Sequence, residues 1–287
     1  MNAVLQYTIQ GLAAGSFYAL AALGLAVIFG VLGVVNFAHG ACYMLGAVTA
    51  AVLLDVLGLG FWWGLIVVPI LLFLFGVLLE RTMVRWLLAL DPLYNFLLTF
   101  GLSLILVDLV KRRYGVSGLP YKRPEVLTGQ IHIGEVGLPT YHVFLFSISI
   151  CLLVWLLMTK TRIGMIVRAS TEKADLARAL GINVNRWVTP VFGFGIALAG
   201  LAGVLAAPFR AITADMGSSF VIILFAVVVI GGLGSIVGAV VAGFLVGLLE
   251  AFGQAYAPAY AQILIFVLMA IVVLVRPAGL FGREEAA

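Results

Sequence analysis

Two polar side chains lie within the longest stretch of the chain that has no charged residue. Asn36 and His39 fall in residues 1–54, where Asp, Glu, Lys and Arg do not occur. A buried polar group costs a few kcal/mol unless it has a hydrogen-bond partner. The pair therefore indicates either a structural hydrogen bond or a contact along a path for a polar solute. Cys42 is close to His39, but one His and one Cys do not make a metal site, so we expect no bound metal.

Glycines flank this polar pair, and the same spacing of small residues recurs near the other end of the chain. Interrupted apolar segments at corresponding places in two halves of a chain are typical of a transport site, because unwound backbone inside a membrane must be buried in protein or line a wet cavity. Close helix packing through glycine produces the same pattern, and the sequence leaves both interpretations open. The candidate pathway residues are Gly33, Asn36, His39 and Gly40 in the first segment and Gly231, Gly234, Ser235 and Gly238 in the second.

The elements that position these residues must be membrane-spanning helices. The 287 residues are 64% hydrophobic and 10% charged, with a mean hydropathy of +1.23. Soluble domains are about 45–50% apolar and about 25% charged. This composition excludes a soluble fold, a nucleic-acid-binding protein and a disulfide scaffold. The net charge of +4 reflects a small excess of Lys and Arg, which membrane proteins place in cytoplasmic loops.

Charge-free runs divide the chain into spans, each of which needs about 20 apolar residues. Residues 1–54 hold two spans with a break near Asn36–Gly40, whereas residues 216–249 are long for one span and short for two. The other runs hold one span each: 56–79, 92–107, 136–159, 187–209 and 251–275. We therefore expect an all-α integral membrane protein with one domain, residues 1–287. It is a polytopic helical bundle of about eight or nine transmembrane segments with two glycine-interrupted helices.

The acidic side chains next to these runs are expected at the ends of spans. They are Asp55, Glu80, Asp108 and Glu250. With no acid inside a span, the chain lacks the pattern of intramembrane acids and bases that proton- or sodium-driven carriers often show. The sequence therefore predicts no fixed counter-ion for a zwitterionic solute in this chain alone.

Three polar connections predict the topology. Residues 80–91 and 160–186 lie on one side of the membrane and residues 111–140 on the other, because one span separates each from the next. Residues 80–91 and 160–186 together hold eight basic residues, and residues 111–140 hold five. The larger number favours a cytoplasmic location for 80–91 and 160–186. Residues 111–140 are then extracytoplasmic, and the alternation around Ile131–Ile133 permits a short β-hairpin there.

The connection at 160–186 carries the signals of a short helix, about Glu172–Leu180. Glu172 and Asp175 complement the helix dipole at its start and Arg178 near its end, and Gly181 follows as a C-terminal glycine. The apolar patch consists of Leu176, Ala177 and Leu180. A helix this short is marginal in water, so it needs a surface to pack on. That surface is the protein's own spans, the membrane or a cytoplasmic partner.

The chain carries no motif for energy conversion. No Gly is followed directly by Lys, so the phosphate-binding loop G-x-x-x-x-G-K-[ST] is absent. Catalytic groups do not cluster either, since His39 is far in sequence from His132 and His142. We therefore expect a protein that is not an enzyme. A self-contained passive channel or carrier and a membrane enzyme are the alternatives.

Five motifs in the same order resemble the LivH-type permease of branched-chain amino-acid ABC importers. They are Asn36–Gly40 with Gly33, the stretch from Arg168 to Asn183, the small-residue run Ala197–Gly203, Gly231–Gly238, and the ending Arg276–Gly282. The resemblance implies a permease subunit in the bacterial plasma (inner) membrane. By this resemblance the subunit would move a small solute inward, and the expected solute is a branched-chain or other hydrophobic amino acid. Importers of urea, amides and other small solutes belong to the same family, so the substrate stays open.

The resemblance also implies the partners. These are a second, related permease subunit, two cytoplasmic ATP-binding subunits and an extracytoplasmic solute-binding protein. ATP and Mg would be bound by the ATP-binding subunits, with no cofactor bound by this chain. Residues Glu172–Gly181 would be the segment that couples the permease to ATP hydrolysis.

Overall fold

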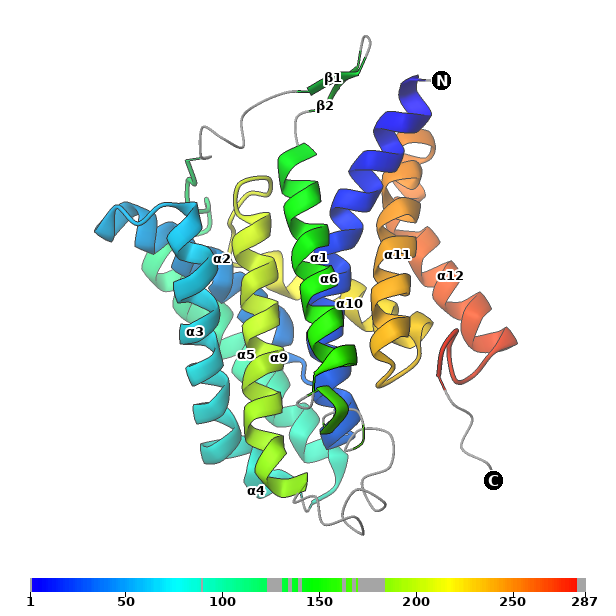
Figure 1. Cartoon of the computed structure of the whole chain (residues 1–287). Helices are drawn as coiled ribbons and strands as arrows, with labels where there is room; N and C mark the ends of the chain where they lie inside the picture. Colours follow the sequence, from blue (N-terminus) through cyan, green and yellow to red (C-terminus); the bar gives the residue numbers. More distant parts are fainter. Residues whose placement is uncertain are drawn as a thin grey trace.

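Helices make up almost all of the described structure, as Figure 1 shows. The computed structural model describes residues 2–88, 90–122, 131–133, 136–138, 141–161, 164–166, 169 and 184–282. The elements are α1 Asn2–Leu32, α2 Ala38–Leu57, α3 Phe61–Leu79, the π-helix η1 Glu80–Val84, α4 Arg85–Leu87, α5 Pro92–Tyr114, β1 Ile131–Ile133, β2 Val136–Leu138, α6 Tyr141–Lys160, α9 Val184–Ala206, α10 Met216–Gly231, α11 Ile236–Tyr256, the 3-10 helix η3 Pro258–Tyr260 and α12 Ala261–Val275.

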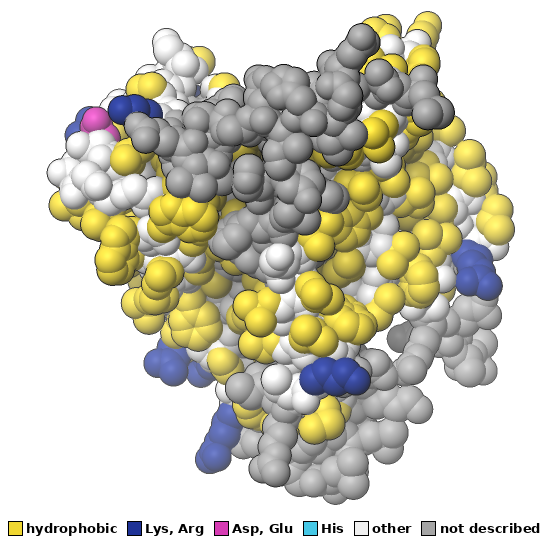
Figure 2. All heavy atoms as spheres, turned by 45° about the horizontal axis from the view of Figure 1, so that its top comes forward, with side chains coloured by type: hydrophobic (Ala, Val, Ile, Leu, Met, Phe, Trp, Pro, Cys, Tyr) yellow, Lys and Arg dark blue, Asp and Glu magenta, His cyan; other side chains and the backbone are white. Residues whose placement is uncertain are grey.

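Most of these helices are long and apolar enough to cross a bilayer. Within the described residues, seven meet that description: α1, α2, α3 continued through η1 and α4, α5, α9, α11, and α12 with η3. Helix α6 has 20 residues, whereas α10 has only 16. On the face shown in Figure 2, hydrophobic side chains cover the middle of the molecule, and Lys and Arg side chains lie at its margins, several of them along the lower edge. The chain is thus a polytopic helical membrane protein, as its sequence predicts.

Residues 216–249 lie in two helices, separated at the break that the sequence shows at Gly231–Ser235. Helix α10 ends at Gly231, and α11 begins at Ile236 after a short turn. Helix α11 continues to Tyr256, so the expected span at 251–275 is in fact the end of α11 followed by η3 and α12. The sequence carries a signal for this boundary in Pro258, since proline is common just after a helix end, but dividing the chain at charged residues placed the boundary at Glu250 instead.

The four acidic side chains lie in the last two turns of their helices, in agreement with the expectation that they are near span ends. Two of them are nevertheless buried, which the sequence analysis did not predict. Glu80 is 0% exposed in the continuous helix Phe61–Leu87, and Glu250 is 9% exposed in α11. Both have polar partners on other helices, described below, and a charged side chain is rarely buried unless it is paired.

The two ends of the bundle carry the connections that the topology predicts. Helix α4 and the start of α9 lie at one end in Figure 1, and the ribbon of β1 and β2 lies at the other. The ribbon is antiparallel, with Ile131 opposite Leu138 and Ile133 opposite Val136. The short hairpin that the sequence permitted is therefore present. We call the end with α4 the inner end and the end with the ribbon the outer end.

Helix α1 lies at the centre of the bundle and packs along α11. A Cβ atom at Gly11 would come within 2.8 Å of the Leu248 backbone, and one at Gly15 within 2.8 Å of the Phe244 backbone. The backbones of the two helices can approach this closely because small residues line the contact. The side chains from Phe17 to Ile28 are almost all buried, so the interior of the bundle is built around the middle of α1.

Candidate functional site

The first predicted break is a turn that joins α1 to α2. Gly33 has a φ of +67°, and its N–H donates to the Phe29 carbonyl at 2.7 Å, so it ends α1 as a left-handed glycine. The Asn36 side-chain oxygen accepts a hydrogen bond from the Ala38 N–H at 3.0 Å. Asn36 thereby satisfies one of the free N–H groups at the start of α2.

Three buried polar side chains lie in this turn and on α2. His39 Nε2 lies 2.9 Å from the Ala21 carbonyl oxygen, so we assign the proton to Nε2. Three other atoms, Asn36 Nδ2, His39 Nδ1 and Tyr43 Oη, have no hydrogen-bond partner among the described residues. His39 and Tyr43 are four positions apart and share a face of α2, and Asn36 lies in the turn just before this helix. The three side chains make one polar group. We call it the polar stripe.

The predicted glycines are packing positions as well. A Cβ atom at Gly40 would overlap the Gly217 carbonyl oxygen and lie 2.6 Å from Val221 Cβ, so α2 and α10 touch through their backbones. Gly231 and Gly238 face each other in the same way across the second turn. Gly40, Gly231 and Gly238 are therefore all sites of close backbone packing. A role for them on a transport path stays a prediction.

The second predicted break is the turn between α10 and α11. Gly234 has a φ of +79°, and a Cβ atom there would lie 3.3 Å from Gly30 Cα. The Ser235 hydroxyl oxygen accepts a hydrogen bond from the Gly238 N–H at 3.1 Å, so Ser235 is the N-cap of α11. The two turns are thus close together, since Gly30 is three residues before Gly33.

The C-terminal segment closes this second turn. Leu280 N–H donates to the Ile230 carbonyl at 2.9 Å and Phe281 N–H to the Gly231 carbonyl at 3.0 Å. Carbonyl groups in the last turn of a helix lack partners within the helix, and residues 280–281 supply them for α10. This explains the ending Arg276–Gly282, whose glycine at 279 has a φ of +81°.

A cluster of charged and aromatic groups lies deeper in the bundle, and the sequence analysis missed it. The Tyr18 hydroxyl donates to Glu250 Oε2 at 2.6 Å and accepts from an Arg210 nitrogen at 3.3 Å. Gln254 donates to the other Glu250 oxygen at 3.1 Å. Glu250 is buried, whereas Arg210 is exposed. One sequence signal was available, because Glu250 is the single charged residue between 216 and 275.

Stacked rings connect this cluster to the polar stripe. The Phe220 ring of α10 stacks on Tyr43 with ring centroids 3.8 Å apart and on Tyr18 with centroids 5.4 Å apart. Helices α1, α2 and α10 therefore meet at these three rings. Tyr18 belongs both to this stack and to the charged cluster, and Tyr43 belongs both to the stack and to the polar stripe. Polar groups are therefore connected from Arg210, through the stacked rings, to His39.

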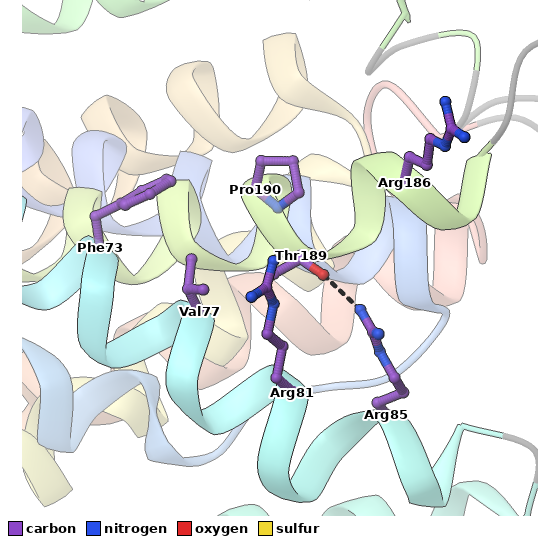
Figure 3. Close-up of a pocket in the computed structure, with 7 residues that line it drawn as sticks. All are labelled: Phe73, Val77, Arg81, Arg85, Arg186, Thr189 and Pro190. Atoms are coloured by element: carbon purple, nitrogen blue, oxygen red, sulfur yellow. Dashed lines mark hydrogen bonds between the residues drawn. The ribbon is translucent and has the colours of Figure 1, made fainter.

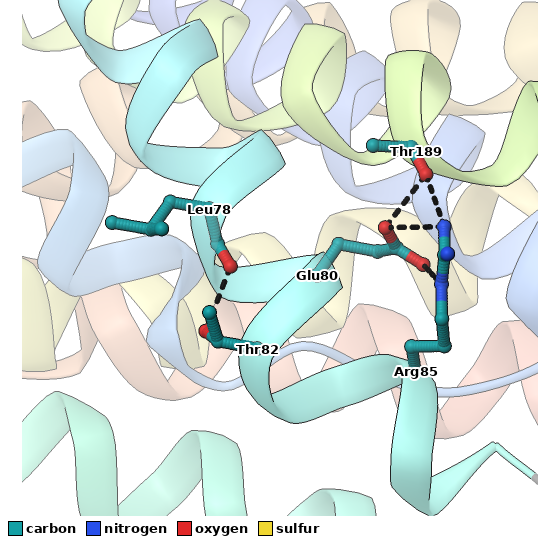
Figure 4. A network of polar contacts seen from close by, with 5 residues as sticks. All are labelled: Leu78, Glu80, Thr82, Arg85 and Thr189. Atoms are coloured by element: carbon teal, nitrogen blue, oxygen red, sulfur yellow. Dashed lines mark hydrogen bonds and ion pairs between the residues drawn. The ribbon is translucent and has the colours of Figure 1, made fainter.

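A second buried charge is neutralised near the inner end (Figure 4). Arg85 donates to both Glu80 oxygens, at 3.1 Å and 3.2 Å. The Thr189 hydroxyl donates to Glu80 at 2.7 Å and accepts from Arg85 at 2.7 Å. The π-helix η1 brings the pair together, because its i→i+5 bonding places residue 85 over residue 80. Helices α3 and α9 are thereby joined by a charge-assisted network.

The other predicted functional residues lie outside the described part of the chain. These are the coupling residues Glu172, Asp175, Leu176, Ala177, Arg178, Leu180 and Gly181. Among the described residues, His, Cys, Asp and Glu form no group that could hold a metal ion.

The arrangement defines a multi-pass membrane protein with two capped helix turns and a polar interior, and comparison with known proteins gives its family. The family model described as "Branched-chain amino acid transport system / permease component" matches residues 7–273. The chain is 32% identical to the high-affinity branched-chain amino-acid permease protein BraD of Pseudomonas aeruginosa, over 98% of this chain and 96% of BraD. It is 30% identical to LivH of Salmonella typhimurium over the same shares of the two chains.

A more distant similarity extends to another solute. The autoinducer 2 import system permease protein LsrD of Salmonella paratyphi B is 32% identical over 48% of this chain and 43% of LsrD. The match of the family model over most of the chain shows that the protein belongs to the branched-chain amino-acid permease family. It is a permease component and not an enzyme, and the predicted resemblance is confirmed.

Proposed function

We propose that this chain is a membrane subunit of an ATP-driven importer of small solutes in a bacterial plasma membrane. The proposed substrates are branched-chain or other hydrophobic amino acids. The observation that carries the proposal is the family match over residues 7–273 together with 30–32% identity to BraD and LivH. Its partners are a second permease, two ATP-binding subunits that hold ATP and Mg, and an extracytoplasmic binding protein. This chain itself binds no cofactor.

The charged cluster provides complementary groups for an amino acid. An amino acid carries a carboxylate and an ammonium group, and the Arg210 guanidinium and the Glu250 carboxylate have the opposite charges. Arginine is well suited to bind a carboxylate, since its planar fork donates two parallel hydrogen bonds. A pathway function for this cluster revises the expectation that the chain has no fixed counter-ion.

The polar stripe supplies the next contacts inward. Each unpartnered buried polar atom costs about 1–3 kcal/mol, and three such atoms in one group favour a place that water or a solute occupies during transport. Asn36, His39 and Tyr43 would exchange hydrogen bonds with the passing solute. Asn36 itself lies in the first turn, and the second turn at Gly231–Ser235 is close to it.

Uptake by the reconstituted complex tests the proposal. Proteoliposomes that contain this chain with its partner permease and ATP-binding subunits should accumulate leucine only with ATP and loaded binding protein. Glu250→Gln and Arg210→Gln should each reduce uptake at least about tenfold, because each removes one charge that the solute contacts. ATP hydrolysis stimulated by the binding protein should persist in both variants, since neither residue lies at the inner end.

Matched variants test the importer assignment and the role of the charged cluster separately. Gln254→Ala removes a hydrogen bond to Glu250 but no charge, and it should retain most uptake. Wild-type complexes without ATP-dependent uptake of any amino acid would overturn the importer assignment. Wild-type uptake in both Glu250→Gln and Arg210→Gln would instead overturn only the role of the charged cluster.

A further inference from the structure

An open pocket at the inner end combines an apolar floor with a basic rim (Figure 3). Its volume is about 710 Å³, and it lies between α3 with η1 on one side and α9 on the other. The lining residues are Phe73, Val77, Arg81, Arg85, Arg186, Thr189 and Pro190. In Figure 3 Arg81 and Arg85 rise from their helix toward α9, whereas the Arg186 side chain extends from α9 away from them, at the edge of the pocket. We call this feature the arginine pocket.

The charges around the pocket leave positive charge without a partner. Arg85 is paired with Glu80, which is itself buried. Arg81 and Arg186 are exposed, and neither forms an ion pair with any acid in the part of the chain that the structure describes. The Glu80–Arg85 pair is neutral, so among the described residues Arg81 and Arg186 give the pocket its positive charge.

The apolar floor of the pocket indicates which kind of anion fits it. Phe73 and Val77 lie in the apolar span α3, two turns and one turn before Arg81 along one helix face. Pro190 lies in α9 next to Thr189. The pocket therefore runs from a basic level at the membrane boundary into the apolar level of the spans. A free phosphate ion or an acidic side chain fills only the basic part.

We propose that the arginine pocket binds one anionic phospholipid, with its phosphate beside Arg81, the Arg186 guanidinium adding positive charge at the edge of the pocket, and the start of an acyl chain against Phe73 and Val77. Basic pockets between transmembrane helices at the cytoplasmic side are a known form of lipid site. The bound lipid would brace α3 against α9 next to the Glu80–Arg85–Thr189 network. This function is separate from solute transport, and it stands whether or not the importer assignment holds.

Native mass spectrometry of the full chain in mild detergent tests the proposal. The probes are dioleoyl phosphatidylglycerol, dioleoyl phosphatidylcholine and inorganic phosphate. The wild type should bind phosphatidylglycerol in preference to phosphatidylcholine. Each arginine near an anionic headgroup contributes about fivefold in affinity, so Arg81→Gln with Arg186→Gln should weaken phosphatidylglycerol binding roughly twenty-five-fold. Phosphatidylcholine binding should change little.

Two further variants complete the experiment. Val77→Trp should displace the acyl chain and weaken phosphatidylglycerol while the arginines remain. Arg276→Gln removes an arginine that lies outside the pocket, and it should bind lipid as the wild type does. All variants are compared with the wild type for thermal unfolding without lipid, so that a folding defect is recognised.

Several results would overturn the proposal. One is a wild type with no preference for phosphatidylglycerol, and another is an unchanged preference in the double arginine variant. Displacement of the lipid by millimolar inorganic phosphate would assign the pocket to a free anion. If the wild type showed no lipid preference but the double variant lost its ATP-binding subunits on purification, the pocket would serve a protein partner instead.

Discussion

Gly40 decides between the two interpretations that the sequence left open for the first turn. In α2 it contacts the Gly217 backbone and Val221, so Gly40→Ala should overpack the contact with α10 and lower the free energy of unfolding by about 1–3 kcal/mol. The matched control is Gly101→Ala in α5, where a Cβ atom meets nothing within 4 Å. That variant should be neutral or gain up to about 1 kcal/mol from helix propensity.

Heating in detergent measures this difference. In a variant with Cys151 replaced by Ala, reaction of the buried Cys42 with a fluorogenic thiol reagent reports unfolding of α2. Equal stability of Gly40→Ala and Gly101→Ala would contradict the packing role. If Gly40→Ala kept its stability but lost uptake, Gly40 would be a pathway residue rather than a packing one.

At the scale of elements, the C-terminal segment should stabilise α10. Ending the chain after Val275 removes the hydrogen bonds from Leu280 and Phe281 to α10. A net contribution of about 0.5–1.5 kcal/mol for each bond gives a loss of about 1–3 kcal/mol. Gly279→Val should also destabilise the protein, because residue 279 has a φ of +81° and a β-branched side chain is strained there.

Thermal unfolding of the purified variants checks this prediction, with a chain that ends after Gly282 as control. The control retains both hydrogen bonds and should unfold with the wild type. If the chain ending after Val275 also unfolded at the wild-type temperature, the contact with α10 would contribute nothing to stability.

At the scale of the whole molecule, the expected coupling helix should determine assembly with the ATP-binding subunits. Leu180→Asp places a charge in the apolar patch, and we expect it to abolish uptake and weaken retention of those subunits during purification. Ala174→Asp introduces the same charge on a different helix face and should retain both. The purified chain alone should hydrolyse no ATP.

The readout is subunit stoichiometry after purification, measured together with uptake. Leu180→Asp that retained its ATP-binding subunits and wild-type uptake would show that this segment is only a surface element. ATP hydrolysis by the purified chain without partners would contradict the permease assignment at a more basic level.

The sequence predicted the spans and turns well, because both depend on local signals. Charge-free runs located the helices, and the repeated glycines located both turns. It did not predict the partners of those glycines, since Gly40 packs against α10 whereas Gly238 packs within its own turn. Such choices depend on which helices become neighbours, and hydrophobic periodicity does not encode that.

The charged clusters were missed for a related physical reason. Tyr18 and Glu250 are 232 positions apart, and Thr189 and Glu80 are 109 positions apart. A single sequence shows that Glu250 is unusual in an apolar run but not which group neutralises it. The π-helix that pairs Arg85 with Glu80 likewise has no composition signal of its own.

The contact between the C-terminal segment and α10 has a consequence for biosynthesis. Translation produces α1 first, yet its partner α11 and the residues that cap α10 emerge at the far end of the chain. Domains generally fold from the N-terminal side during synthesis, but here the last turn of α10 gains its hydrogen bonds only after α12 has been made and inserted. A nascent chain halted before Leu280 therefore presents an uncapped helix end, which would mark an incomplete permease for the membrane's quality-control proteases.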